Sequence, residues 1–204
     1  MSQIQTLSIR DFAQIAKADL AFGDLTVLVG AQGTGKSLAL QWLKAALDGK
    51  QILNALRDAG QDAKKANQRI DLIFGAGMGA AWREGSAVRF ENAEIAPENL
   101  ARRGDGTGTV FYIPAQRAML VSDGWAARFK DVTPGTPVVA RLFSEYLFDQ
   151  LNARDLLFPV PKLLKKDYRK AIDSAVFHGG KVTLIRDQLH TKRLRLEVDG
   201  EKLP

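Results

Sequence analysis

The sequence predicts an α/β fold, and three observations support this prediction. Polar and apolar residues alternate over residues 4–9 and again over 15–22, which indicates two antiparallel strands near the N-terminus. A continuous apolar run, LTVLV at residues 25–29, follows them and is typical of a strand buried on both faces. Apolar residues then recur at helical spacing over residues 38–47. We therefore expect a mixed sheet with N-terminal antiparallel strands and flanking helices.

The rest of the chain continues this pattern of strands and helices. Gly49 is expected to end the first long helix, and TVFYI at residues 109–113 is expected to form a second buried strand. We interpret residues 1–204 as a single domain, with residues 50–82 as a candidate helical arm, because this region has helix formers and few aromatics. Asp199-Gly200 is expected as the return turn of a C-terminal hairpin. The remaining predicted helices are 52–60, 63–74, 139–151 and 168–176, and the remaining strands 87–90, 181–185 and 193–198.

Composition excludes several function classes. Hydrophobic residues make up 46% of the chain and charged residues 25%, which is typical of a folded globular protein. There is no cysteine, so disulfides, thiolate metal sites and cysteine nucleophiles are excluded, and a reducing compartment is favoured. No apolar run approaches the roughly 20 residues of a membrane helix, and the N-terminus does not have the layout of a signal peptide. We expect a cytoplasmic protein without a membrane partner.

The chain is basic, with 29 Lys and Arg against 23 Asp and Glu. This balance permits contact with phosphates, including those of DNA. The excess is concentrated in residues 162–170 and 181–195. Such runs are either solvated helix faces or nucleic-acid contacts. Salt-sensitive DNA binding that depends on Lys165, Lys166 and Arg169 would favour the second interpretation.

The strongest motif is GAQGTGKS at residues 30–37, which fulfils the spacing G-x-x-x-x-G-K-[ST]. Its glycines allow backbone N–H groups to wrap around a phosphate, and the following helix adds the positive end of its dipole. The motif predicts that Lys36 reaches the β- and γ-phosphates of ATP and that Ser37 is a ligand of Mg²⁺. The alternative is a glycine-rich turn that matches by accident. The predicted binding residues are Gly30, Ala31, Gln32, Gly33, Thr34, Gly35, Lys36 and Ser37.

Three segments together resemble the ABC-type P-loop ATPase heads of the SMC/RecF/OLD group: IRDF at 9–12, LTVLVGAQGTGKS at 25–37 and VFYIPAQR at 110–117. The resemblance implies a P-loop NTPase fold whose adenine pocket lies near Arg10 and Phe12, although both residues also have a structural interpretation. It further implies that Gln116 is the Q-loop glutamine, a catalytic residue and magnesium ligand. The alternative for Gln116 is an exposed loop glutamine. Arg117 would contact phosphate or form an ion pair.

The chain departs from this family in ways that bear on catalysis. Many such heads have Asn where this chain has Gln32, and neither a signature segment nor an apolar strand ending in Asp-Glu is present. Asp71 and Asp105 are weak candidates for a displaced magnesium ligand. The chain therefore resembles the N-terminal portion of a head. We expect ATP hydrolysis to need segments or a partner absent here, and the isolated chain to be weakly active or inactive.

The expected function is that of a nucleotide-dependent switch in DNA maintenance or anti-phage defence, with ATP and Mg²⁺ as cofactors. By resemblance, its partners would be a second copy of the chain through head pairing, in a homodimer or higher oligomer, and an effector or nuclease; DNA is a further candidate. The alternative is a non-catalytic nucleotide-binding scaffold that contacts DNA or an effector through the basic segments. A kinase or GTPase-like switch would need an acceptor site or base-reading motif that we do not find. His178 and His190 form no zinc motif.

Overall fold

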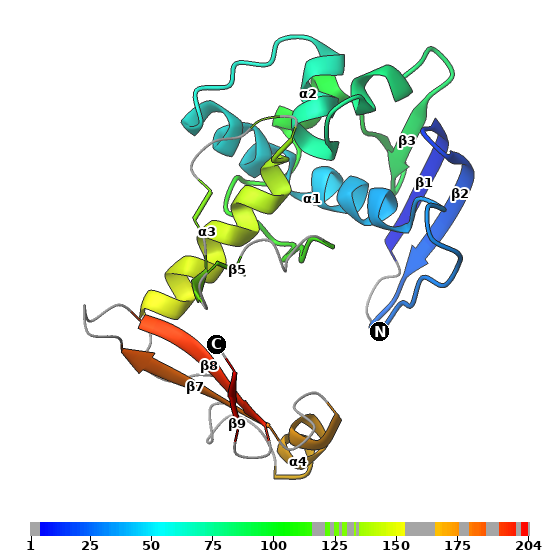
Figure 1. Cartoon of the computed structure of the whole chain (residues 1–204). Coiled ribbons are helices and arrows are strands. Elements are labelled where there is room, and N and C mark those ends of the chain that lie inside the picture. Colours follow the sequence, from blue (N-terminus) through cyan, green and yellow to red (C-terminus); the bar gives the residue numbers. More distant parts are fainter. Residues whose placement is uncertain are drawn as a thin grey trace. The chain divides into compact units, whose positions relative to one another are not determined.

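The computed structural model describes residues 5–115, 121–122, 125–126, 128–129, 133, 135–153, 166–175, 180–186, 192–198 and 201–203. The chain divides into two compact units. One comprises Met1–Ala115 with Phe129–Phe143, and the other comprises Gln116–Arg128 with Ser144–Pro204. Figure 1 shows helices and strands of both units.

The first unit contains a four-stranded antiparallel sheet in the order β2-β1-β3-β4. Its strands are β1 (Gln5–Phe12), β2 (Ile15–Phe22), β3 (Ala87–Phe90) and β4 (Ala93–Glu94). The predicted N-terminal strand pair and the predicted strand at 87–90 are thus confirmed. Alternation along β1 directs Leu7 and Ile9 into the core, where their exposed fractions are 1% and 0%.

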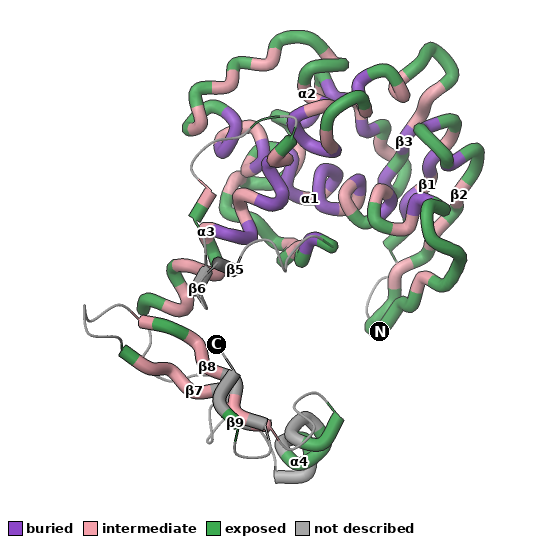
Figure 2. Tube along the Cα trace, viewed as in Figure 1, coloured by how far each residue is buried: buried purple, intermediate pink, exposed green. Residues whose placement is uncertain are grey.

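Helices pack against this sheet, and Figure 2 shows the buried residues gathered between them. They are α1 (Lys36–Asp58), α2 (Ala66–Phe74) and two 3₁₀-helices, η1 (Met78–Ala81) and η2 (Pro97–Arg102). α1 runs to Asp58, beyond the predicted end at Gly49, but its backbone is not helical at Asp48, so a kink beside Gly49 separates two helical stretches. Gly49 is also required by close packing, since a Cβ there would lie 2.5 Å from the carbonyl oxygen of Leu100.

An aromatic cluster holds the sheet and the helices together. Phe12 of β1 contacts Trp42 of α1 edge-to-face, with ring centroids 5.3 Å apart, and contacts Phe74 of α2 at the same separation. Trp82 lies 5.4 Å from Trp42. Residues of the 50–82 segment, Ile52 and Phe74 among them, belong to the same hydrophobic core as β1. This segment therefore contributes to the core of the first unit.

Two predicted buried strands are absent from the structure. Residues 25–29 and 109–113 form no strand and belong to none of the three sheets among the described residues. Leu25 is 85% exposed, Val29 90% and Phe111 54%. The prediction of burial on both faces is therefore wrong for these segments. The physical reason is that the described residues supply no neighbouring strand for either segment.

The second unit contains an antiparallel sheet in the order β7-β8-β9, formed by β7 (Lys181–Arg186), β8 (Lys192–Val198) and β9 (Glu201–Leu203). The two predicted strands here are confirmed. Asp199-Gly200, the predicted return turn, lies outside the described residues; the strands before and after it in the chain, β8 and β9, pair antiparallel with Val198 opposite Glu201. The other elements are β5 (Val121–Ser122), β6 (Trp125–Ala126), α4 (Lys166–Ala175) and α3 (Val138–Ala153), whose first residues belong to the first unit.

Within the described ranges, no helix combines the length and the apolar character that crossing a bilayer requires.

Candidate phosphate-binding site

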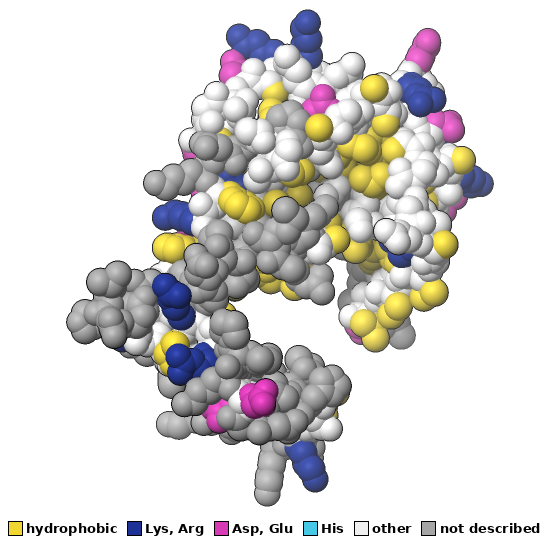
Figure 3. All heavy atoms as spheres, in the orientation of Figure 1, with side chains coloured by type: hydrophobic (Ala, Val, Ile, Leu, Met, Phe, Trp, Pro, Cys, Tyr) yellow, Lys and Arg dark blue, Asp and Glu magenta, His cyan; other side chains and the backbone are white. Residues whose placement is uncertain are grey.

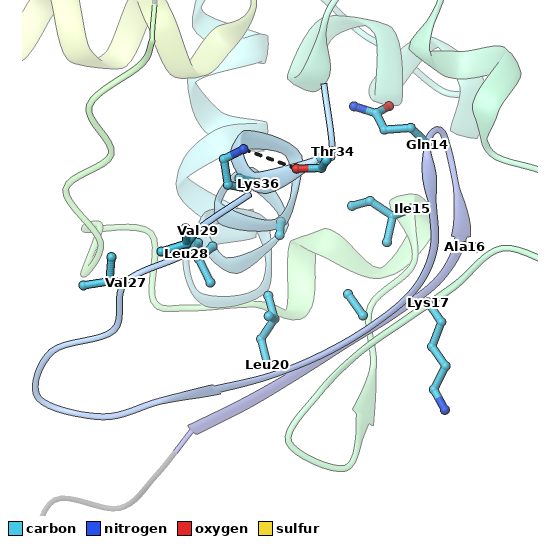
Figure 4. Close-up of a pocket in the computed structure, with 13 residues that line it drawn as sticks. Gln14, Ile15, Ala16, Lys17, Leu20, Val27, Leu28, Val29, Thr34 and Lys36 are labelled. Carbon is cyan, nitrogen blue, oxygen red and sulfur yellow. Dashed lines mark hydrogen bonds between the residues drawn. The ribbon is translucent and has the colours of Figure 1, made fainter. Parts of the chain in front are cut away.

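The glycine loop lies between the extended segment 25–29 and the first turn of α1 (Figure 4). Gly33 and Gly35 have φ values of +82° and +89°, a region that side chains other than glycine rarely adopt. At Gly35 the packing is also close, because a Cβ there would lie 2.8 Å from Cδ1 of Ile15 in β2. The loop conformation and its contact with β2 therefore both require glycine at this position.

Lys36 is the charged group of the loop. Its Nζ donates hydrogen bonds to the carbonyl oxygens of Gly30 (2.8 Å) and Ala31 (2.6 Å) and to Oγ1 of Thr34 (3.2 Å). Figure 4 shows the last of these bonds across the loop. Among the described residues, no carboxylate forms an ion pair with Lys36. The ammonium group is thus held by neutral acceptors and its charge has no counter-ion there.

The N-terminus of α1 adds further positive potential. The helix begins after Gly35, which offers no side-chain cap, and its first intrahelical bond runs from the N–H of Ala39 to the carbonyl of Gly35. Within the described chain, the N–H groups of Lys36, Ser37 and Leu38 have no acceptor. Free N–H groups at a helix N-terminus attract anions, and the helix dipole has the same sign.

Two hollows meet at Lys36. The first, of about 460 Å³, is lined by the glycine loop together with Ser37 and Gln14. The second, of about 530 Å³, lies between β2 and residues 27–29 and has a mixed lining that includes the apolar Ile15 and Leu20 and the charged Lys17 (Figure 4). Both hollows share the four residues Gln14, Thr34, Gly35 and Lys36. Two hollows with mixed polar and apolar linings therefore adjoin each other at Lys36.

The structure brings together only part of the predicted site. Gly30, Gln32, Gly33, Thr34, Gly35, Lys36 and Ser37 line the first hollow, and the carbonyl of Ala31 accepts a hydrogen bond from Lys36. The side chain of Ser37 is exposed and accessible from this hollow. Gln116 and Arg117 lie outside the described residues, as do His178 and His190. The predicted roles of Gln116 and Arg117 therefore stay predictions.

The weak candidates for a magnesium ligand are engaged elsewhere. Oδ1 of Asp71 accepts a hydrogen bond from the N–H of Gly79 at 2.7 Å. Oδ1 of Asp105 accepts bonds from the N–H and hydroxyl of Thr107, and these bonds hold the pKa of Asp105 below its usual value. Neither aspartate lines the two hollows. No cluster of three His, Asp or Glu side chains suited to a metal occurs among the residues that the structure describes.

Arg10 and Phe12, which the resemblance placed near the adenine pocket, have structural roles. Phe12 is completely buried in the aromatic cluster. Nη2 of Arg10 donates to Oδ1 of Asp19 at 2.7 Å, across the β1–β2 pair. The residues that do face the loop are Gln14 and Ile15, which the sequence analysis missed. The sequence signal that could have identified them is their position at the turn between the two predicted N-terminal strands.

A buried polar network was also missed by the sequence analysis. Nζ of Lys44 donates to Oδ2 of Asp48 and to the carbonyl oxygen of Val110, at 2.7 and 2.8 Å. Asp48 also accepts hydrogen bonds from the backbone of Thr109 and Val110. Burial raises the pKa of Asp48, but the hydrogen bonds from Lys44, Thr109 and Val110 outweigh it and hold the pKa below its usual value. The network joins α1 to Thr109 and Val110, which follow the loop after η2.

Comparison of the chain with family models, with curated proteins and with solved structures finds no match. The function is therefore argued from the residues and the geometry of the site.

Proposed function

We propose that residues 30–37 bind the phosphates of ATP with Mg²⁺, and that the chain is an ATPase-head module that acts as a nucleotide-dependent switch. The observation that supports this proposal best is the position of Lys36. Its ammonium group has no counter-ion among the described residues and lies beside free N–H groups at the start of α1. This arrangement matches the charge and the hydrogen-bonding capacity of a phosphate chain.

The phosphates and the base of the nucleotide would occupy different hollows. Phosphates would occupy the hollow lined by the glycine loop, where Lys36 exchanges its bonds to the carbonyls of Gly30 and Ala31 for charge-assisted bonds to phosphate oxygens. The base would occupy the adjoining hollow, whose lining includes Ile15 and Leu20. Apolar walls with a few polar groups are typical of sites for small-molecule ligands.

Magnesium would be held chiefly by the phosphates and by water, with the hydroxyl of Ser37 as a protein ligand and Gln116 as a second. The described residues offer no carboxylate beside Ser37 within the hollow. Since hydrolysis needs a group that polarises water, we propose that turnover depends on segments or a partner outside this chain. The isolated chain would bind nucleotide with little hydrolysis.

Calorimetric titration with ATP and Mg²⁺ tests this function directly. Wild-type protein should bind saturably, and Lys36→Ala should abolish binding because it removes the charge of the loop. Lys64→Ala is the matched control, since Lys64 is an exposed lysine that lines neither hollow. Binding by the control but not by Lys36→Ala supports the site. A wild-type chain that does not bind ATP would contradict the proposal.

A second candidate is a non-catalytic nucleotide-binding scaffold that contacts DNA or an effector through basic segments. One observation favours it: the basic runs at 162–170 and 181–195 both fall in the second unit, where β8 includes Lys192, Arg193 and Arg195. Fluorescence anisotropy with duplex DNA across a salt series tests this candidate, using a Lys165→Ala, Lys166→Ala, Arg169→Ala triple variant. Unchanged DNA affinity in that variant would show that the basic run at 162–170 does not contact DNA.

A further inference from the structure

The two hollows meet at a junction whose lining they share. Gln14, Thr34, Gly35 and Lys36 line both hollows. In the proposed function, phosphates occupy the hollow of the glycine loop and the base occupies the hollow beside β2, and Figure 3 shows hydrophobic side chains at the surface of the first unit near β2. The ribose links the base to the phosphates covalently, so it must lie at this junction. The four shared residues are therefore the ones that the ribose would meet.

Gln14 has the one uncommitted polar side chain of these four residues. Oγ1 of Thr34 donates to the carbonyl oxygen of Ala31 at 3.0 Å and accepts from Nζ of Lys36 at 3.2 Å. Gly35 has no side chain, and the charge of Lys36 is assigned to the phosphates. The side-chain amide of Gln14 forms no hydrogen bond with any residue that the structure describes. It therefore offers both a donor and an acceptor to a ligand at the junction.

The β1–β2 turn holds Gln14 at this position. Ala13 and Gln14 form the turn, and the residues on either side of them, Phe12 and Ile15, pair across the two strands. Phe12 is 0% and Ile15 6% exposed, so buried side chains anchor both ends of the turn. Cγ of Gln14 lies 3.7 Å from the place that a Cβ on Gly35 would take. Figure 4 shows the amide of Gln14 directed from the turn toward the glycine loop.

We propose that Gln14 binds the ribose of the nucleotide and makes the site selective for ribonucleoside triphosphates; this inference rests on the proposed function. The carbonyl oxygen of the amide accepts a hydrogen bond from one of the adjacent 2′- and 3′-hydroxyls, and its NH₂ group donates to the other. A deoxyribose that lacks either hydroxyl loses one of these two bonds. Gln14 is thus a specificity-determining residue, distinct from the groups that bind phosphate.

Calorimetric titration of the full chain with ATP, 2′-deoxyATP and 3′-deoxyATP, each with Mg²⁺, tests this role. Wild-type protein should bind ATP about three- to tenfold more tightly than either deoxynucleotide, the range expected for one hydrogen bond. Gln14→Met keeps a long unbranched side chain but removes the amide, so it should bind ATP more weakly and all three nucleotides equally. Gln68→Met is the matched control, because Gln68 is an exposed glutamine of α2 that lines neither hollow. It should keep the wild-type preference.

Titration with inorganic tripolyphosphate and Mg²⁺ separates the ribose contact from the phosphate site. This probe has no ribose, so Gln14→Met should bind it with wild-type affinity, which also verifies that the glycine loop of the variant is intact. Equal affinity of the wild type for ATP and both deoxynucleotides would overturn the inference. So would a preference for ATP that persists in Gln14→Met, or a loss of tripolyphosphate binding in that variant as large as its loss of ATP binding.

These outcomes are distinguishable from a failure of the proposed function. In each of them the wild type still binds ATP, so the phosphate site stands while the role of Gln14 is rejected. A wild-type chain that binds neither ATP nor tripolyphosphate would instead contradict the proposed function, and the ribose contact would be overturned with it.

Discussion

The Nζ atom of Lys44 lies 2.7 Å from Oδ2 of Asp48, and the two side chains are only 6% and 1% exposed. Two further acceptors, Oε1 of Gln51 and the carbonyl oxygen of Val110, take the remaining protons of the ammonium group. Asp48 is also the residue at which α1 departs from helical geometry. The helix that starts at the glycine loop is therefore fixed to residues 109–110 by a buried, fully satisfied ion pair.

Replacing Lys44 by methionine should destabilise the first unit strongly. Methionine fills much of the same volume, but Asp48 would be left as a buried charge without its partner. Breaking a buried pair in this way costs about 3–5 kcal/mol of unfolding free energy. Chemical denaturation measures the loss, with Lys50→Met as an exposed control on the same helix. A loss no larger than that of the control would show that Asp48 does not need the ammonium group.

The same pair predicts a dependence on pH. The folded-state pKa of Asp48 is held below its usual value of 3.8, so the unfolded chain binds the proton more readily. The stability that ionised Asp48 contributes is therefore complete above pH 3.8 and is lost as the pH falls through the folded-state pKa. The difference in unfolding free energy between wild type and Asp48→Asn should shrink across this range. Asp19 and Asp105 titrate in both proteins, so their contributions cancel in this difference. A difference in unfolding free energy that stays constant with pH would contradict the prediction.

Local patterns in the sequence predicted most of the local structure. Alternation located β1 and β2, and helical periodicity located α2, because both signals reflect one buried face and one exposed face. The spacing of the glycine motif likewise located the loop and the start of α1. These features depend on neighbours in the chain, which is why sequence reasoning reached them.

Features that depend on distant residues were missed or wrong. Gly49 signals a helix end by composition, but here it allows η2 to approach α1 closely. Residues 25–29 have the composition of a buried strand, yet burial needs neighbouring strands that the described residues do not contain. The contact of Ile15 with Gly35 and the ion pair of Lys44 also depend on tertiary packing. No local pattern encodes them.

Substituting alanine for Gly35 should disrupt the glycine loop at residues 30–37. The new Cβ would meet the side chain of Ile15, and the positive φ of +89° adds backbone strain. Gly60→Ala is a matched control, because Gly60 has a φ of +73° with no atom within 4 Å of the added Cβ. Strain alone costs about 1–2 kcal/mol, so Gly35→Ala should lose clearly more unfolding free energy than the control. Equal losses in thermal unfolding would mean that β2 moves aside without cost.

Replacing Ser37 by alanine separates the roles of phosphate binding and metal binding. The hydroxyl of Ser37 is exposed at the first hollow, next to Lys36, while the charge that attracts phosphate belongs to Lys36 and the helix N-terminus. Ser37→Ala should therefore keep the affinity for ATP measured in a chelator. It should lose the gain in affinity that Mg²⁺ confers, by roughly ten- to hundredfold, the range found when the support of a metal site is removed. Calorimetric titrations with and without Mg²⁺ measure both affinities, and Ser37→Thr should restore the gain because threonine keeps the hydroxyl. If Mg²⁺ strengthens ATP binding equally in the wild type and in Ser37→Ala, the metal is held by other groups and Ser37 is not its ligand.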